Sequence, residues 1–218
     1  RRSTIVTENS LRFQIDLTHG HKTGFFCDQR DNRLALTQWT ADADVLDLCC
    51  YTGGFGVYAA ALGKAKSVTC VDLDEKAVSL AQRNANLNKI PRSQLETVHA
   101  DLFPYLRQIK EKRHPQIIVL DPPKLIPNRD SFFEGRGKYF DMNKLALELF
   151  SPSGSGGGGG ILVTCSCSGL FSMSDFHDML RTAARFARRQ VQILRSTGPG
   201  LDHPFMVDAP ESSYLKCV

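Results

Sequence analysis

Short apolar segments alternate with segments of helical spacing along most of this chain, and this alternation limits the folds that it can adopt. The predicted strands are Val45–Cys49, Ser67–Asp72, Leu95–Asp101, Gln116–Asp121, Ile161–Cys165, Val191–Leu194 and Tyr214–Val218. The helices between them are predicted at 54–63, 75–87, 103–112, 143–150 and 175–189. Helical crossovers join parallel strands, so we expect an α/β fold with a seven-stranded, mostly parallel sheet and helices on both faces.

The N-terminal residues follow a different pattern. Leu11–Leu17 alternates apolar and polar residues, which predicts a half-buried strand. We expect Thr18–Gly24 to form a turn and Phe25–Asp28 to return as the second strand of a hairpin, followed by a helix at 31–39. The predicted organisation is therefore a hairpin and helix in residues 1–40, followed by a single domain in residues 41–218.

Composition excludes several classes of protein. The 218 residues carry a net charge of +4 and an odd number of cysteines, seven. The closely spaced pairs, Cys49-Cys50 and Cys165-x-Cys167, have no partner pair at zinc spacing, so neither a disulfide framework nor a metal site is expected. No apolar run approaches the length of about 18–20 residues that spans a bilayer. We expect a cytoplasmic protein without a membrane partner.

A glycine-rich turn at 53–56 lies between the first parallel strand and the first helix of the predicted domain. Such a turn lets backbone N–H groups approach a ligand near the positive end of a helix dipole. The spacing Gly53-Gly54-x-Gly56 matches neither the dinucleotide fingerprint nor a P-loop. Asp47, at the strand end, would repel a phosphate and suits a ligand with a free amino group. S-adenosylmethionine is such a ligand.

Four predicted strands end in an aspartate: Asp47, Asp72, Asp101 and Asp121. In open parallel sheets ligands bind at the carboxyl ends of strands, so these acids are expected to line one crevice. An acid at the second strand end suits ribose hydroxyls, and Asp101 can accept a hydrogen bond from the adenine amino group. For any single one of them, the alternative interpretation is a helix cap.

Three separated sequence signatures narrow the range of possible protein families. They are Lys22–Arg33, Leu120–Lys124 (Leu-Asp-Pro-Pro-Lys) and Thr164–Leu170 (Thr-Cys-Ser-Cys-Ser-Gly-Leu). The order of strands and acids over residues 44–218 resembles the Rossmann-like class I methyltransferases. Together with the C-terminal segment 203–216, the three signatures resemble the bacterial 23S ribosomal RNA 5-methylcytosine methyltransferases. The resemblance implies S-adenosylmethionine as cofactor, with Asp47 and the glycine turn at its methionine part. The implied cofactor contacts are Gln29, Arg33, Asp47, Tyr51, Thr52, Gly53, Gly54, Phe55, Asp72, Leu73, Asp101, Leu102 and Asp121.

The same resemblance implies partners. The family acts on RNA of the large ribosomal subunit and carries an N-terminal RNA-binding PUA domain. We expect that domain, and most of the linker domain before the hairpin, to be missing from the 218 residues. We therefore expect a fragment of a longer protein, and a homodimer is one option for its assembly. Basic and aromatic residues after the Asp-Pro-Pro-Lys motif are expected to contact RNA: Arg129, Arg136, Lys138 and Tyr139.

Two cysteines close to the fifth strand bear on the reaction. Carbon 5 of cytosine becomes nucleophilic only after a nucleophile adds to carbon 6, and a cysteine thiolate suits that step. One of Cys165 and Cys167 is expected to face the pocket, and the resemblance points to Cys167, while Cys165 suits the strand core. Asp121 is then expected to bind the base, and Lys124 or a water molecule to accept the carbon 5 proton.

Two other functions compete with this prediction. Asp121-Pro-Pro is also compatible with methylation of a base nitrogen, although Lys124 occupies the position where an aromatic residue would stack on the base. A catalytically silent module with the same fold, binding RNA, is the third option. The stretch 151–160, rich in glycine and serine, is predicted to be a flexible loop.

Overall fold

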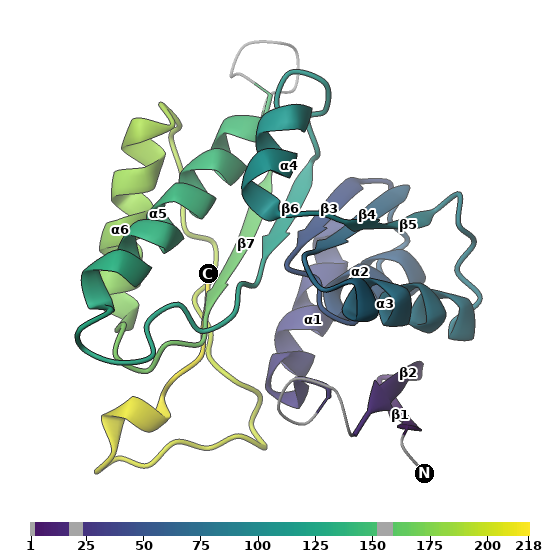
Figure 1. Cartoon of the computed structure of the whole chain (residues 1–218), viewed down its shortest axis with the longest axis horizontal. Coiled ribbons are helices and arrows are strands. Elements are labelled where there is room, and N and C mark those ends of the chain that lie inside the picture. The colour runs from purple at the N-terminus through teal and green to yellow at the C-terminus, as the bar shows by residue number, and fades with distance from the viewer. Residues whose placement is uncertain (1–2, 18–23, 152–158) are drawn as a thin grey trace. The chain divides into compact units, whose positions relative to one another are not determined.

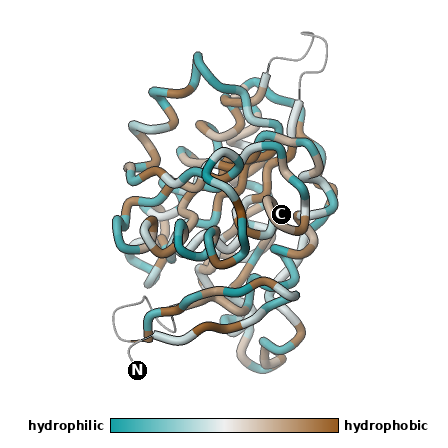
Figure 2. Tube along the Cα trace, turned by 90° about the vertical axis from the view of Figure 1, so that its right-hand side faces the viewer, coloured by the Kyte–Doolittle hydropathy of each residue, from teal (hydrophilic) through white to brown (hydrophobic). Residues whose placement is uncertain are grey.

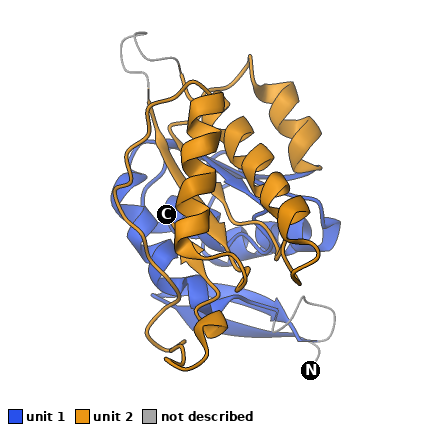
Figure 3. Ribbon diagram, turned by 90° about the vertical axis from the view of Figure 1, so that its left-hand side faces the viewer, with its two compact units in different colours: residues 1–100 blue, residues 101–218 orange. Residues whose placement is uncertain are grey.

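The computed structural model describes residues 3–17, 24–151 and 159–218, which form two compact units, 1–100 and 101–218 (Figure 3). The unit boundary falls inside the range 41–218 predicted as one domain, and the division at residue 40 stays a prediction. Most of the predicted turn at 18–24 and of the glycine-rich loop lies outside the described residues.

The first unit begins with an antiparallel hairpin of β1 (Ser3–Glu8) and β2 (Leu11–Asp16). Its two-residue turn, Asn9 and Ser10, has φ values of 46° and 69°, the left-handed pair that matches the twist of hairpin strands. Every second residue of β2 is buried, as the alternating pattern predicts. Figure 2 shows the alternation of hydrophilic and hydrophobic residues along the trace.

The partner of β2 differs from the predicted one. Phe25–Asp28 does not return as a strand: Cys27–Gln29 forms a 3-10 helix that runs into α1 (Arg30–Leu36), with a further 3-10 turn at Thr37–Trp39. The hairpin was thus predicted with the wrong second strand. The physical reason is that Phe25 packs its ring on Phe13, at a centroid distance of 4.8 Å, so its apolar character serves the core and not a ladder.

Three parallel strands form the sheet of the first unit, in the order β5 (Leu95–His99), β4 (Ser67–Asp72) and β3 (Asp44–Leu48). Their crossovers are α2 (Gly54–Ala61) and α3 (Glu75–Leu87), which pack on the strands (Figure 1). Helix α3 begins at a capping aspartate, Asp74, whose carboxylate accepts hydrogen bonds from two backbone N–H groups of the first turn. This is the predicted α/β arrangement.

The second unit repeats the arrangement with β6 (Ile117–Leu120) and β7 (Ile161–Ser166) in parallel, and β8 (Lys216–Cys217) antiparallel to β7. Its helices are α4 (Leu102–Ile109), α5 (Phe132–Leu149) and α6 (Met173–Phe186), with a 3-10 turn at Pro210–Ser212. Helices α5 and α6 lie side by side around an aromatic core, in which Tyr139 stacks on Phe171 at 5.4 Å.

Two predictions for this unit need correction. Val191–Leu194 forms no strand, and its apolar side chains are exposed, so six of the seven predicted strands occur in the described part of the chain. Helix α5 begins at Phe132 and not at Asn143, because two glycines hid the helical pattern. At one of them, Gly135, a side chain would meet the carbonyl oxygen of Leu125, so glycine permits the close approach of that loop.

No helix in the described part of the chain is long and apolar enough to cross a membrane. The same residues contain no cluster of three or more histidine, cysteine or acidic side chains that could hold a metal ion.

Candidate functional site

The turn between β3 and α2 adopts a sparsely populated backbone conformation. Cys49, Tyr51 and Gly53 have φ values of 56°, 48° and 77°. Residues with a side chain pay a conformational penalty in this left-handed region, and such conformations cluster at functional sites. The turn is closed by a hydrogen bond of 2.8 Å from the Gly53 N–H to the Cys50 carbonyl oxygen.

The glycines that follow leave no room for side chains. A methyl group at Gly56 would overlap the Cys70 sulfur and lie 3.2 Å from a carboxylate oxygen of Asp47. One at Gly54 would lie 3.1 Å from the side chain of Arg33. The backbone therefore packs closely against its neighbours here. Binding of a ligand by the N–H groups of the turn stays a prediction.

Asp47 is fully buried and braces this turn. Its Oδ2 accepts a hydrogen bond of 2.8 Å from the Gly56 N–H and contacts the Cys70 thiol at 3.9 Å. The carboxylate thus lies at the N-terminus of α2, where a negative charge is favourable. The role predicted for Asp47, binding the amino group of the cofactor, stays a prediction.

Asp72 lies at the carboxyl end of the neighbouring strand, β4. Its Oδ2 accepts a hydrogen bond of 2.7 Å from the Tyr51 N–H, and its Oδ1 accepts one of 2.9 Å from the Asp74 N–H. The carboxylate therefore holds the strained turn beside it. Each carboxylate oxygen has a second lone pair, so the two bonds leave acceptor capacity for ribose hydroxyls.

Leu73 follows Asp72 and has 65% of its surface exposed, which is unusual for a leucine beside buried strands. Its carbonyl oxygen lies 2.9 Å from Nε2 of His99, so the backbone is anchored while the side chain stands free. An exposed leucine next to the predicted ribose acid suits the flat face of an adenine. Thr52, in the turn, and Phe55, in the first turn of α2, were also predicted as contacts. Both side chains are buried.

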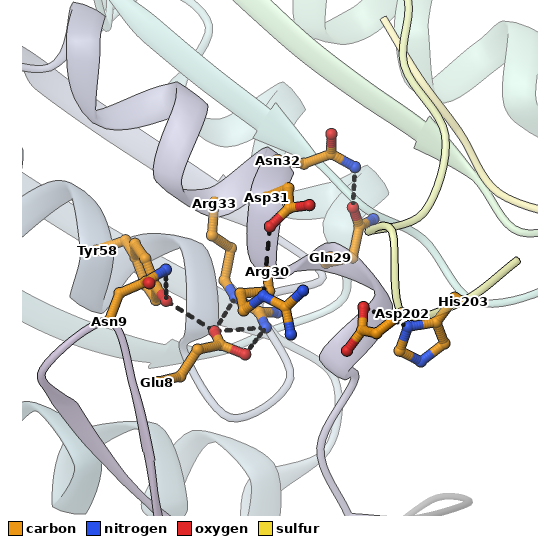
Figure 4. A network of polar contacts seen from close by, with 10 residues as sticks. All are labelled: Glu8, Asn9, Gln29, Arg30, Asp31, Asn32, Arg33, Tyr58, Asp202 and His203. Carbon is orange, nitrogen blue, oxygen red and sulfur yellow. Dashed lines mark hydrogen bonds and ion pairs between the residues drawn. The ribbon is translucent and has the colours of Figure 1, made fainter.

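Gln29 is the residue before α1 and Arg33 lies in its last turn, and both are buried (Figure 4). The Arg33 guanidinium binds the Glu8 carboxylate through Nε at 3.0 Å and Nη2 at 2.8 Å, and it lies over the rings of Phe25 and Tyr58. Its Nη1 points toward Gly54, where an added methyl group would lie 3.3 Å away. The Arg33 side chain thus reaches the glycine turn, as its predicted cofactor role requires.

Figure 4 also shows the Tyr58 hydroxyl, which donates to Glu8 at 2.8 Å and accepts from the Asn9 side chain at 3.0 Å. Three further contacts in the figure are local to their segments. Gln29 accepts a hydrogen bond of 2.7 Å from the Asn32 side chain, and Arg30 pairs with Asp31 at 3.3 Å. Asp202 and His203 pair with each other at 3.0 Å in the second unit.

Two residues that support the turn escaped the sequence prediction. Glu8 ends β1 and is buried against Arg33, and Asn84 lies on the buried side of α3. The Asn84 side chain donates to the Thr52 carbonyl oxygen at 3.0 Å and accepts from the Gln14 N–H at 2.8 Å. The only sequence signal was a polar residue between Ala81 and Ala85 on the apolar side of the predicted helix.

The second unit contains the remaining predicted residues. Asp101 caps α4: its Oδ1 accepts a hydrogen bond of 2.8 Å from the Phe103 N–H, and the residue is otherwise exposed, while Leu102 is buried. The alternative interpretation of the strand-end acids, a helix cap, is therefore observed for Asp101. Its proposed contact with adenine stays a prediction, since the second lone pairs of the carboxylate are not used by the cap.

Asp121 and Cys167 lie directly beyond the carboxyl ends of two neighbouring strands. In the parallel register of β6 and β7, Leu120 pairs with Thr164, which brings the residues that follow them to the same edge. Asp121 is partly exposed, and Pro122-Pro123 then lead to Lys124, which is exposed. These three predicted catalytic residues therefore belong to one edge of one unit.

The two cysteines of the motif differ in environment. Cys165 is fully buried inside β7 and pairs with Cys217 of β8. The strand ends at Ser166, so Cys167 leaves the pleat and is partly exposed. Residues two apart on a regular strand would point to the same face. Cys165 and Cys167 differ in exposure because the strand ends between them. The choice of Cys167 is compatible with this geometry.

Ser168 fixes the segment that carries Cys167. Its Oγ accepts a hydrogen bond of 3.2 Å from the Ile126 N–H and lies 3.1 Å from the Tyr139 hydroxyl. The Cys167 segment is thereby joined to the loop after Asp-Pro-Pro-Lys and to helix α5.

The residues predicted to contact RNA are only partly suited to it. Arg136, Lys138 and Tyr139 belong to helix α5 and not to a loop, and Tyr139 is completely buried. Lys138 is exposed and pairs with Glu134 at 2.6 Å, one turn earlier on the helix. Tyr139 is therefore excluded as an RNA contact, because it is a core residue, and Arg129 and Lys138 remain exposed candidates.

Parallel strands joined by helices, with a tight glycine turn after β3 and an acid after β4, define a Rossmann-like nucleoside-binding enzyme. Residues 2–187 match the model of the S-adenosylmethionine-dependent methyltransferases, and the chain belongs to that family. The predicted Rossmann-like class and the predicted cofactor are confirmed. The residues that contact the cofactor, which the resemblance implied, remain predictions.

Curated relatives carry a more specific name. "Ribosomal RNA large subunit methyltransferase I" of Pseudoalteromonas atlantica is 42% identical over 97% of this chain, which covers 52% of that protein. The protein of the same name from Aeromonas salmonicida is 41% identical, with the same coverage. The chain spans about half the length of the curated relatives it matches.

A solved structure gives the same result for the fold. A crystal structure described as a methyltransferase complexed with SAH superposes with a TM-score of 0.85 at 25% identity, covering 99% of this chain and 55% of that one.

Proposed function

We propose that this chain is the catalytic part of an enzyme that methylates carbon 5 of a cytosine in large-subunit ribosomal RNA, with Cys167 as nucleophile. The observation that carries the proposal is the place of Cys167, partly exposed just beyond β7 and beside the strand end that bears Asp121, while Cys165 is buried. The names of the curated relatives support ribosomal RNA of the large subunit as the substrate class.

The cofactor site fits S-adenosylmethionine on three observations of the first unit. The glycine turn after β3 has the left-handed backbone conformations that cluster at functional sites, Asp72 retains acceptor capacity, and Leu73 offers an exposed apolar surface. Asp47, Tyr51, Gly54 and the Arg33 guanidinium would hold the methionine part, and Asp72 and Leu73 the adenosine. When bound, S-adenosylmethionine supplies an electrophilic methyl group.

The residues of the second unit would act on the base. A cytosine turned out of its RNA context presents its edge to Asp121, whose carboxylate accepts a hydrogen bond from the amino group or from a protonated N3. The Cys167 thiolate forms a bond to carbon 6, and the electron pair of the 5,6 double bond makes carbon 5 nucleophilic. The prolines after Asp121 fix the path of the chain beside the base, because their φ angles are restricted.

The final step restores the ring. Lys124 or a water molecule takes the proton from carbon 5, the 5,6 double bond forms again, and Cys167 leaves as thiolate. Cys167, Asp121 and Lys124 thus have the roles of nucleophile, base-binding acid and proton acceptor in the proposal.

Trapping the covalent intermediate tests the proposal. RNA of the large subunit transcribed with 5-fluorocytidine is incubated with the protein and S-adenosylmethionine, and the adduct is mapped by mass spectrometry. Fluorine replaces the proton that must leave, so the adduct should accumulate on the peptide containing Cys167. Cys167→Ala should form no adduct and no 5-methylcytosine, whereas Cys165→Ala should retain both.

The controls separate the competing functions. Titration calorimetry with S-adenosylmethionine should show that Cys167→Ala binds the cofactor like the unmodified protein. Full methylation by Cys167→Ala would rule out the thiolate mechanism. Nucleosides methylated on a base nitrogen would favour nitrogen methylation, and the absence of cofactor binding would favour a silent module.

A further inference from the structure

Lys216 is a lysine with only 3% of its surface exposed. It lies on β8, which pairs with the end of β7, where Ser166 is its direct neighbour. Its Nζ donates to the Ser168 carbonyl oxygen at 2.6 Å and to the Tyr214 carbonyl oxygen at 2.7 Å. The first of these carbonyls belongs to the residue after Cys167, so the ammonium group is fixed to the segment that carries the proposed nucleophile.

A buried ammonium group is costly unless it is paired with an opposite charge and hydrogen-bonded. In the described part of the chain, Nζ of Lys216 forms no ion pair with a carboxylate and binds carbonyl oxygens only. An ammonium has three N–H donors, and the two carbonyls occupy two of them. The third N–H donor of Lys216 and its positive charge can therefore act on another group near the Cys167 segment.

Cys167 lies between Ser166, which pairs with Lys216, and Ser168, whose carbonyl oxygen binds Nζ, so its thiol is the candidate for this group. Burial lowers the pKa of Lys216 to about 8, while the negative charges of the Cys167 thiolate and of Asp175, on α6, act to raise that pKa. Helix α5 contributes Tyr139, whose pKa is raised by burial, with hydrogen bonds to Ser166 and Ser168 opposing the shift. The thiolate of Cys167 also acts on Tyr139. Cys167 thus lies within electrostatic reach of both groups.

We propose that Lys216 is a positioning residue of the Cys167 segment and that its ammonium charge stabilises the Cys167 thiolate. The thiol loses its proton to solvent, and the fixed positive charge favours the resulting anion. The inference rests on the proposed role of Cys167 as nucleophile, for which a thiolate is the reactive form. Lys216 acts through Cys167 and is assigned no contact with the RNA base.

The same contacts would also serve a purely structural role, in which Lys216 only ties β8 to the carbonyl of Ser168. A structural role affects stability, whereas a charge near the thiol also changes its pKa. Near pH 7, a lysine with a pKa of about 8 is mostly protonated, so the charge is present when the enzyme works. The thiol pKa therefore separates the two roles.

The experiment measures the pH dependence of Cys167 alkylation. The folded protein is treated with iodoacetamide between pH 5.5 and 9.5, and modification of the Cys167 peptide is followed by mass spectrometry, with buried Cys165 as internal control. In the unmodified protein the midpoint should lie about one unit or more below the value of about 8.5 for a free thiol. In Lys216→Met the midpoint should rise, and alkylation at pH 7 should slow about ten-fold.

Lys216→Gln and Lys216→Arg complete the set. The glutamine keeps hydrogen-bond donors without charge and should behave like methionine, whereas arginine keeps the charge and should retain most of the reactivity. Equal midpoints in the unmodified protein and in the folded methionine or glutamine variant would overturn the proposal. If neither neutral variant folds, the unmodified protein decides, because a midpoint at 8.5 or above contradicts a stabilised thiolate.

The readout also separates this inference from the proposed function. A lowered thiol pKa that depends on Lys216, together with full methylation by Cys167→Ala, would reject the nucleophile and retain the charge relationship. An ordinary thiol pKa with an adduct trapped on Cys167 would reject Lys216 alone.

Discussion

The guanidinium of Arg33 binds both oxygens of the Glu8 carboxylate, with Nη2 at 2.8 Å from Oε1 and 3.0 Å from Oε2. Both side chains are nearly completely buried, and the Tyr58 hydroxyl donates to the same carboxylate at 2.8 Å. This cluster joins the hairpin to α1 and to α2, the helix that follows the glycine turn. The N-terminal hairpin therefore supports the proposed cofactor site.

Removing Glu8 should destabilise the protein strongly. Glu8→Ala leaves the Arg33 charge buried without its partner, and a broken buried pair typically costs about 3–5 kcal/mol. Chemical unfolding followed by circular dichroism measures the change. The matched control is Arg30→Ala, which breaks the exposed pair with Asp31 and should cost less than about 1 kcal/mol. Similar losses in the two variants would show that the Glu8 pair is not a buried brace.

Asn84→Ala should weaken both stability and cofactor binding. Its side chain bonds the Gln14 N–H and the Thr52 carbonyl oxygen, and each buried group left without a partner costs about 1–3 kcal/mol. The control is Asn88→Ala on the same helix, because Asn88 bonds only the Arg12 backbone on the hairpin and the Asn84 carbonyl oxygen. Titration calorimetry should show weaker binding of S-adenosylmethionine for Asn84→Ala only, and equal affinities would contradict the link to the turn.

Local patterns predicted the framework of this protein and of its cofactor site. A strand, a glycine turn and a helix follow one another between Asp44 and Ala61, so the sequence alone identifies the turn and the acid before it. The same holds for Asp72 and Asp121, each of which ends a short apolar run. These features depend on residues near one another in the chain, and their positions follow from the alternation of strands and helices.

Long-range partners could not be predicted in this way. Glu8, Asn84 and Lys216 each contact residues 25 or more positions away, and these contacts do not follow from the residues around them in the sequence. The hairpin shows the same limit, since the runs at 3–8 and 25–28 are both apolar enough to pair with β2. Residues 3–8 form the partner strand of β2, because Phe25, in the other run, packs into the core.

Gly56→Ala should prevent formation of the turn. A methyl group there would overlap the Cys70 sulfur and crowd Asp47 Oδ2 and Val68, each at 3.2 Å, and overpacking of this kind costs about 1–3 kcal/mol. The matched control is Gly137→Ala on α5, where no atom lies within 4 Å. That substitution should stabilise the helix by about 0.5–1 kcal/mol. Thermal unfolding with and without S-adenosylmethionine measures both, and an unchanged shift by the cofactor in Gly56→Ala would contradict the prediction.

Lys216 should make the stability of the protein depend on pH in alkaline solution. Its pKa is about 8 in the folded state, because burial disfavours the charge, and 10.5 is its usual value. Between these values the unfolded chain binds more protons than the folded one, so the free energy of unfolding rises with pH across the window and is level outside it.

The comparison with Lys216→Met isolates this contribution from those of other groups. Relative to the variant, the unmodified protein should gain about 1–3 kcal/mol of stability as the pH rises from 8 to 10.5. Lys138→Met, which removes an exposed lysine, should show no such difference. Urea unfolding at half-unit steps of pH gives the curves. A stability difference that stays level, or that falls with rising pH, would show that the Lys216 ammonium is not disfavoured by burial.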